Sequence, residues 1–241
     1  MKINMINPIA FTGTVKTDIS DSHGNKIPPK NLYNIREYNT LASPDFLDLD
    51  IGIKKDKPLG YFTNSTDTYR VTLSQNMPKA KNPITESLVT NPLLKRMGQS
   101  AREAEIRQCF YDTLTSLLQK SIKFADDKNS SDKVNINILD KTGNIIPQEK
   151  LGILEEIQKL SNFYGLDILV KKSDNFTFAV KTKVPYMIYI SKQLGEDVIK
   201  AEAPALIDNI LNNAAIEEEI KHGIYRTFVR LIQEWVLKVK K

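Results

Sequence analysis

Few residues of this sequence have the types and spacing that catalysis or metal binding requires. The chain has two histidines, His23 and His222, and a single cysteine, Cys109. The histidines lack metal-ligand spacing, and one cysteine excludes an internal disulfide or a zinc site built from cysteines. Gly24 and Gly143 stand alone in turn sequences and do not form a phosphate-binding loop. We therefore predict no metal and no cofactor, and the residues favour a protein that is not an enzyme.

Acidic residues recur near the start of two predicted helices. They form two pairs with the same spacing: Glu103 with Glu105, and Glu217 with Glu219. Side chains two residues apart on a helix point in different directions, so neither pair can act together on one substrate. Acids near a helix N-terminus interact favourably with its dipole. We predict structural roles, including ion pairs of Glu103 with Arg107 and of Glu217 with Lys221.

Six residues are candidates for binding a partner: Lys54, Lys55, Lys171, Lys172, Tyr111 and Tyr225. The lysine pairs lie at the ends of two predicted strands, where they could form two basic patches or could protect strand edges from pairing. The two tyrosines lie one step from the apolar side of a helix. Each could be half-buried with a hydrogen bond at its tip, or it could line a groove between two halves of the protein.

The sequence repeats itself, and the repeat predicts how these residues are positioned. It consists of three colinear matches: residues 15–32 with 134–151, 49–74 with 166–191, and 101–119 with 215–233. The registers are 119, 117 and 114 residues, and the first and third matches have 8 of 18 and 8 of 19 identical positions. Nearly constant registers predict a tandem duplication of a unit of about 115 residues, packed as an internal pseudo-dimer.

The repeat predicts an α+β fold in which each unit consists of a β-hairpin, a helix, two or three strands and a long helix. The predicted segments are an extended arm at 1–14, a first unit at 15–125, a linker at 126–133 and a second unit at 134–241. The turns should end at Gly24 and Gly143 with positive φ. Residues 176–180 read as a strand, and Pro92 and Pro204 read as the starts of helical segments.

Apolar stripes at helical spacing predict the core of each long helix. They are Ile106, Phe110, Leu114 and Leu117 in the first unit, and Ile220, Ile224, Phe228 and Leu231 in the second. Trp235, the single tryptophan, should extend the second stripe. The arm at 1–14 has no counterpart in the second unit, so we expect it to contact a partner or a second copy of the chain.

Composition and charge describe a folded protein without a membrane anchor. The chain has 241 residues, 41% hydrophobic and 26% charged, and its apolar runs are too short to cross a bilayer. The first residues lack a continuous apolar segment of the secretory type, so we predict a cytoplasmic protein. The net charge of +5 comes from residues 1–125, with 17 basic against 12 acidic residues; residues 126–241 carry 17 of each.

These patterns favour a non-enzymatic binding or assembly protein built from two duplicated units, with a protein partner or self-association and no membrane insertion. The alternative is a nucleic-acid-binding protein that uses the basic first half, although aromatic residues interleaved with lysine or arginine are missing. A third possibility is an enzyme whose site lies in a cleft between the units, where Asp50 and Asp167 would converge.

Overall fold

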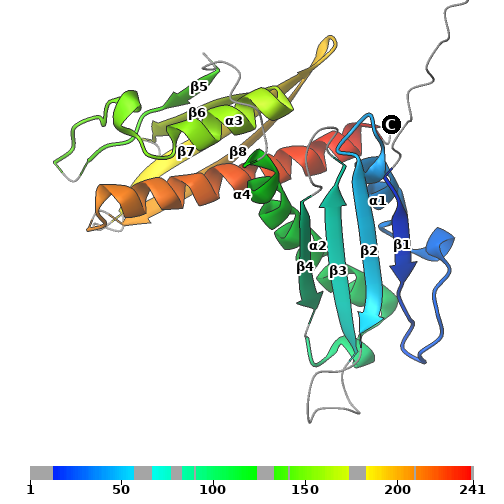
Figure 1. Ribbon diagram of the computed structural model, residues 1–241. Helices are drawn as coiled ribbons and strands as arrows, with labels where there is room; N and C mark the ends of the chain where they lie inside the picture. The colour runs from blue at the N-terminus through cyan, green and yellow to red at the C-terminus, as the bar shows by residue number, and fades with distance from the viewer. Residues whose placement is uncertain are drawn as a thin grey trace, which may run out of the picture. The chain divides into compact units, whose positions relative to one another are not determined.

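The computed structural model describes residues 13–56, 67–76, 83–89, 91–123, 133–140, 142–173, 183–208 and 210–239. The chain divides into two compact units, Met1–Leu118 and Gln119–Lys241. Two four-stranded mixed sheets and four α-helices lie in the described residues, which confirms the α+β class (Figure 1). The described helices include none that is long and apolar enough to cross a membrane.

The elements follow the same order in both sheets. The first sheet and its helices are β1 (Val15–Asp18), α1 (Ile35–Ala42), β2 (Leu49–Asp56), β3 (Thr68–Gln75), β4 (Ile84–Val89) and α2 (Gln99–Ile122). The second set is β5 (Val134–Ile136), α3 (Leu154–Tyr164), β6 (Leu166–Lys172), β7 (Lys183–Leu194), β8 (Asp197–Asp208) and α4 (Asn213–Val239). Single 3-10 turns precede α1, α2 and α3 at Pro29–Asn31, Leu94–Arg96 and Gln148–Lys150.

The two sheets have the same topology. Their strand orders are β1-β2-β3-β4 and β5-β6-β7-β8, with the first pair parallel and the others antiparallel. A parallel pair needs a crossover connection, which α1 and α3 provide. The pairing is also in the same register, since Val15 lies opposite Ile51 and Val134 lies opposite Ile168. The common strand order expected from the sequence is therefore observed.

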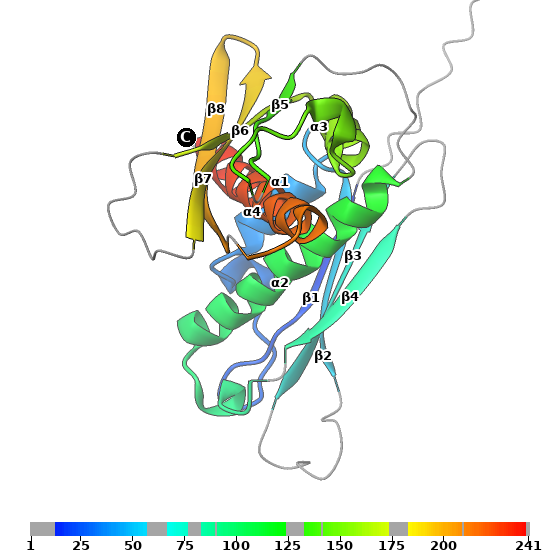
Figure 2. The same cartoon turned by 90° about the vertical axis from the view of Figure 1, so that its left-hand side faces the viewer.

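Each sheet buries one face under its helices. In β2 the side chains of Leu49, Ile51 and Ile53 are buried, whereas the intervening residues are partly or fully exposed. Figures 1 and 2 show α2 on one face of the first sheet. In the second unit, α4 packs on β7 and β8, while α3 packs on β5 and β6. The face of each sheet that points away from its helices is called the open face below.

The predicted turns have the expected geometry. The backbone N–H of Gly24 donates to the Asp21 carbonyl at 3.1 Å, and that of Gly143 donates to the Asp140 carbonyl at 3.0 Å. The φ angles of the two glycines are +88° and +86°, in a region that side chains disfavour. Gly13 meets a different constraint, because a Cβ atom there would lie 2.3 Å from the Leu49 carbonyl oxygen.

The structure corrects several local expectations. In each unit, the segment expected as a β-hairpin is an edge strand instead. β1 pairs in parallel with β2, and β5 pairs in parallel with β6. The turn after each strand makes one isolated bridge rather than a hairpin ladder. Pro204 does not precede a helix; it lies within β8. The fourth strands, β4 and β8, were not expected from the sequence. In β8 the alanine, glutamate and proline residues are weak strand formers. The strand expected at 176–180 lies outside the described residues, as do residues 1–12 of the arm.

The long helices bury the predicted stripes. All eight stripe residues are at most 1% exposed. Trp235, however, is only partly buried, and Val236 takes the next buried position along α4. The Trp235 ring lies 5.3 Å from the Nζ atom of Lys192. The expectation that Trp235 belongs to the core is therefore wrong, because the rotation of the helix places position 236 toward the sheet.

The first testable prediction concerns this difference along α4. Phe228 is 1% exposed and its ring centroid lies 4.9 Å from that of Tyr164. We expect Phe228→Ala to lower the free energy of unfolding by about 3–5 kcal/mol, and Trp235→Ala to lower it by less than half as much. Chemical denaturation followed by circular dichroism measures both. Equal losses in the two variants would contradict the packing described for α4.

Candidate functional site

The four candidate lysines do not form two compact basic patches. Successive side chains of a strand point to opposite faces, so Lys54 and Lys171 lie on the open faces while their neighbours point the other way. Lys55 pairs with Asp67, with Nζ and Oδ1 2.9 Å apart. The Nζ atom of Lys171 lies 5.3 Å from the centroid of the Tyr189 ring. Lys172 is exposed at the end of β6.

Tyr111 and Tyr225 are buried, and each hydroxyl donates to a glutamate on the short helix of its unit. Tyr111 is 4% exposed and donates to Oε1 of Glu37, which also accepts from Arg107 Nε at 3.0 Å. Tyr225 is 0% exposed and donates to Oε1 of Glu156 at 2.8 Å. Each tyrosine therefore links the long helix to the short helix of its unit. The buried rings and bonded hydroxyls are engaged within the unit.

The two glutamate–tyrosine clusters also contain a cation at the same helical position. Arg107 contacts both carboxylate oxygens of Glu37, at 3.0 and 3.1 Å from Nε. Lys221 lies 3.6 Å from Oε2 of Glu156 and 2.7 Å from Oε2 of Glu218. The predicted pairs of Glu103 with Arg107 and of Glu217 with Lys221 are therefore wrong. Arg107 pairs with Glu37 of the short helix, whereas Lys221 pairs with Glu218 on its own helix and, at a longer distance, with Glu156 of the short helix.

Burial and charge perturb the titration of these clusters. Burial raises the pKa of Tyr111 and of Tyr225, and the charge of the adjacent glutamate raises each further. Burial alone would lower the pKa of Arg107, but the hydrogen bond and charge of Glu37 raise it overall. At neutral pH each cluster thus contains a neutral hydroxyl donor beside a protonated cation, because the pKa of Arg107 and that of Lys221 are raised by their carboxylate partners. This arrangement suits a structural tether.

Glu103 of α2 and Glu217 of α4 accept hydrogen bonds at the N-termini of the short helices α1 and α3. Oε2 of Glu103 accepts from the backbone N–H of Tyr33 at 2.8 Å, just before α1. Oε2 of Glu217 accepts from the backbone N–H of Ile153 at 3.2 Å, at the N-cap of α3. The two carboxylates are 2% and 8% exposed. The N–H groups at a helix N-terminus lack partners within the helix. Glu217 therefore satisfies a buried donor at Ile153, whereas Glu103 satisfies a partly buried one at Tyr33.

The remaining sequence candidates for chemistry have contacts within their own units or are exposed. Asp50 accepts from the backbone N–H of Thr14 at 2.8 Å and from its hydroxyl at 2.7 Å. Asp167 lies 4.0 Å from the Nζ atom of Lys133. His23 is exposed in its turn. Neither aspartate is buried, and the described residues include no group of three or more histidine, cysteine, aspartate or glutamate side chains arranged to hold a metal ion.

The open face of the second sheet carries a strip of apolar side chains that the sequence analysis missed. Leu169 lies opposite Tyr189 on adjacent strands, and Met187 lies opposite Pro204. Leu206 follows two residues farther along β8 and is 51% exposed. These five residues are called the apolar strip. The signal was available, because Met187 and Tyr189 alternate with buried Ile and Tyr residues, so that β7 is apolar on both faces.

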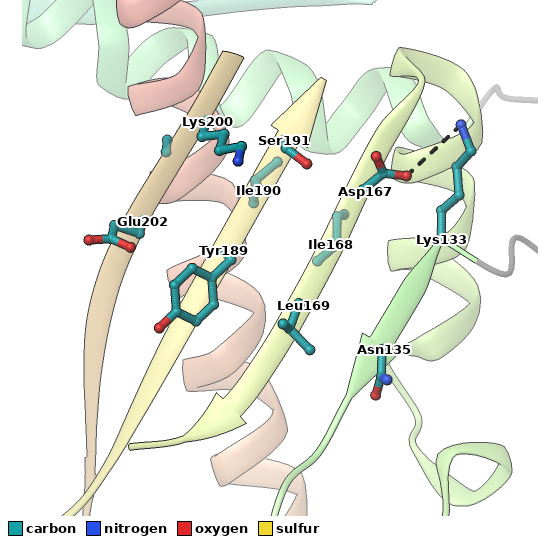
Figure 3. A pocket seen from close by; sticks show the side chains of 11 residues that line it. Lys133, Asn135, Asp167, Ile168, Leu169, Tyr189, Ile190, Ser191, Lys200 and Glu202 are labelled. Carbon is teal, nitrogen blue, oxygen red and sulfur yellow. Dashed lines mark ion pairs between the residues drawn. The ribbon is translucent and has the colours of Figure 1, made fainter. Parts of the chain in front are cut away.

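A hollow of about 770 Å³ lies on this open face, over one end of the apolar strip (Figure 3). Asp167, Ser191 and Lys200 are neighbours across β6, β7 and β8 and form its polar end. Figure 3 shows Lys200 pointing toward Ser191, and Lys133 reaching Asp167 from the other side. Glu202 lies opposite Tyr189 on β8. The hollow thus combines an apolar wall with a charged rim.

The matching face of the first sheet is polar. Gly52, Arg70 and Thr72 occupy the positions of Leu169, Met187 and Tyr189 at the repeat register of 117. Two further residues hold Arg70 in place: its guanidinium lies 2.6 Å from Asp56 and 2.8 Å from Glu86. The hollow here is smaller, about 370 Å³. Water can solvate this face.

No protein-family model matches the chain, and no curated protein matches its sequence. Inference about function therefore depends on the geometry of the two units.

The caps provide a second testable prediction. Glu217→Ala leaves a backbone N–H at the start of α3 without its partner, so we expect a loss of about 1–3 kcal/mol in the free energy of unfolding. Glu219→Ala is the matched control, since this residue is exposed two positions along the same helix. We expect it to change stability by less than about 0.5 kcal/mol. Urea denaturation of both variants tests the cap; losses of equal size would refute it.

The third prediction concerns alkaline stability. Above pH 10, the ordinary pKa of tyrosine, the unfolded chain releases the Tyr225 proton while the folded chain retains it. The unfolded state then binds fewer protons, so stability falls as pH rises, by up to about 1.4 kcal/mol per pH unit for this group. We expect Tyr225→Phe to flatten the decline in unfolding free energy between about pH 10 and pH 11. Parallel declines in wild type and variant would show that Tyr225 ionises equally in both states.

Proposed function

We propose that this chain is a non-enzymatic binding protein that arose by tandem duplication of one α+β unit, in which the second unit presents the partner-binding surface. The observation that carries the proposal is the difference between the two open faces. Equivalent positions hold Gly52 and Thr72 in the first sheet and Leu169 and Tyr189 in the second. The predicted packing of the units as an internal pseudo-dimer stays a prediction.

Matched contacts support the duplication beyond strand order. The Tyr69 hydroxyl accepts from the backbone N–H of Ser20 at 3.1 Å, and the Tyr186 hydroxyl accepts from that of Leu139 at 3.1 Å. The buried caps and the glutamate–tyrosine clusters described above also recur at the repeat registers. Separate origins would have to produce each of these long-range polar contacts independently, so descent from one unit is the simpler account.

Divergence at exposed positions supports the binding role. Core positions stayed apolar in both units because each sheet must bury one face. The open-face positions were free to change, and those of the second unit became apolar. An exposed apolar patch with a charged rim is typical of an interaction site, because water alone gives no reason to keep Leu, Met and Tyr side chains together on a surface. The small hollow of the first face and its engaged Arg70 fit a solvated surface instead.

Photocrosslinking tests this function in the organism that makes the protein. A photoreactive phenylalanine analogue placed at Tyr189 should form a specific adduct with a partner, whereas the same analogue at Thr72 should not. Met187→Arg, which introduces the residue of the first unit, should suppress the adduct from position 189. Circular dichroism should show that the variant remains folded, since Met187 lies on the open face. Equal adducts from positions 72 and 189, or none from 189, would contradict the proposal.

A further inference from the structure

The dimensions of the apolar strip restrict what can cover it. Tyr189 and Leu206 mark its ends, and the partner of Leu206 on β7 is Pro185, four residues from Tyr189. At about 3.3 Å per residue, the strip is about 13 Å long. It extends from β6 to β8, which is about 10 Å for two strand spacings. A helix about 10 Å wide spans this length in two to three turns.

Pairing of an extended partner along the β8 edge fits the structure less well. Pro204 has no backbone N–H to donate to β7. At its pair with Met187 the backbone groups of β8 therefore point away from β7, toward the open edge of the sheet. Glu202, two residues away, has the same orientation, and its carbonyl oxygen accepts from Arg230 at 3.0 Å. The centre of the edge therefore lacks one donor and has one acceptor already engaged, which makes the face the more favourable place for a partner.

The charges around the strip favour an acidic partner. Lys171 and Lys200 make no ion pair within the part of the chain that the structure describes, and both are exposed. Asp167 has Lys133 as a partner at 4.0 Å, and Asp208, at the far end of β8, lies opposite Lys183. Glu202 is therefore the remaining acid beside these two lysines on the described part of the second open face. A second copy of the chain would bring the same excess of lysine to the interface, and like charges would oppose that contact.

We propose that the apolar strip is a docking site for an amphipathic helix of a partner protein, with acidic residues beside its apolar stripe. This inference rests on the proposed binding function and specifies its partner. The helix would lie along β7 and complete a third layer, since α3 and α4 already cover the other face of the same sheet. Apolar side chains spaced three and four residues apart would contact Leu169, Met187 and Tyr189. Acids on its flanks would approach Lys171 and Lys200.

The test uses the full chain and three labelled peptides of about 18 residues, long enough for five turns. The first has leucine at three- and four-residue spacing with glutamate on both flanks. The second has the same composition in an order without an apolar stripe, and the third has lysine in place of glutamate. Fluorescence anisotropy measures binding. We expect the first peptide to bind on the order of tenfold more tightly than either control, and its affinity to fall as salt rises.

Variants locate the binding and keep the inference falsifiable. Tyr189→Thr with Met187→Gln, which removes apolar contact area without adding charge, should weaken binding of the first peptide on the order of tenfold, whereas Thr72→Ala on the first open face should leave it unchanged. Failure of the first peptide to bind, or equal binding to the double variant, overturns the helix site. If position 189 still forms its specific crosslink, the binding function stands and the class of partner is wrong. A crosslink to a second copy, with dimers in sedimentation, also overturns the helix inference.

Discussion

Each unit of this protein has enough helix to cover one face of its sheet, and the rest of the structure depends on that constraint. A twisted four-stranded sheet must bury an apolar face to be stable, and the long helix with its short companion provides one layer of cover. The other face must be polar enough for water or must be covered by something else. In the first unit this second face is polar, with Arg70 paired to Asp56 and Glu86. In the second unit it is largely apolar, and Leu206 on it is exposed.

Polar contacts in buried positions set how the helices sit on each sheet. Apolar packing is non-directional, so the stripes on α2 and α4 alone would permit small shifts along the sheet. The caps from Glu103 and Glu217 and the bonds from Tyr111 and Tyr225 do not permit such shifts, because a displaced helix would leave buried donors unpaired. Glu103 and Glu217 from the repeated acid pairs, and the binding candidates Tyr111 and Tyr225, are explained by this positioning.

The two units can be compared position by position because their sheets share one topology. Where they agree, as at the turn glycines and the capping glutamates, the residue makes the same structural contact in both. Where they differ on the surface, the fold accommodates either residue. Gly52 shows that the difference is not steric, because a Cβ atom there would meet its nearest neighbours at an ordinary 3.7 Å. The apolar strip of the second sheet is therefore a feature that the fold does not require, which is why we propose that it binds a partner.

The sequence by itself determined the α+β class, the shared order of elements, the turns at Gly24 and Gly143, and the buried stripes of both long helices. These follow from local rules: periodicity, turn chemistry and the repeat. Tertiary structure decided the rest. β8 was hidden because Pro204 and its alanines disfavour a strand until a neighbouring strand pairs with them. Arg107 pairs with Glu37, 70 residues away in sequence, rather than with Glu103 one turn along the helix, since packing brings that carboxylate to it. Likewise, the apolar strip exists only when three strands lie side by side, because its residues are isolated from one another along the chain.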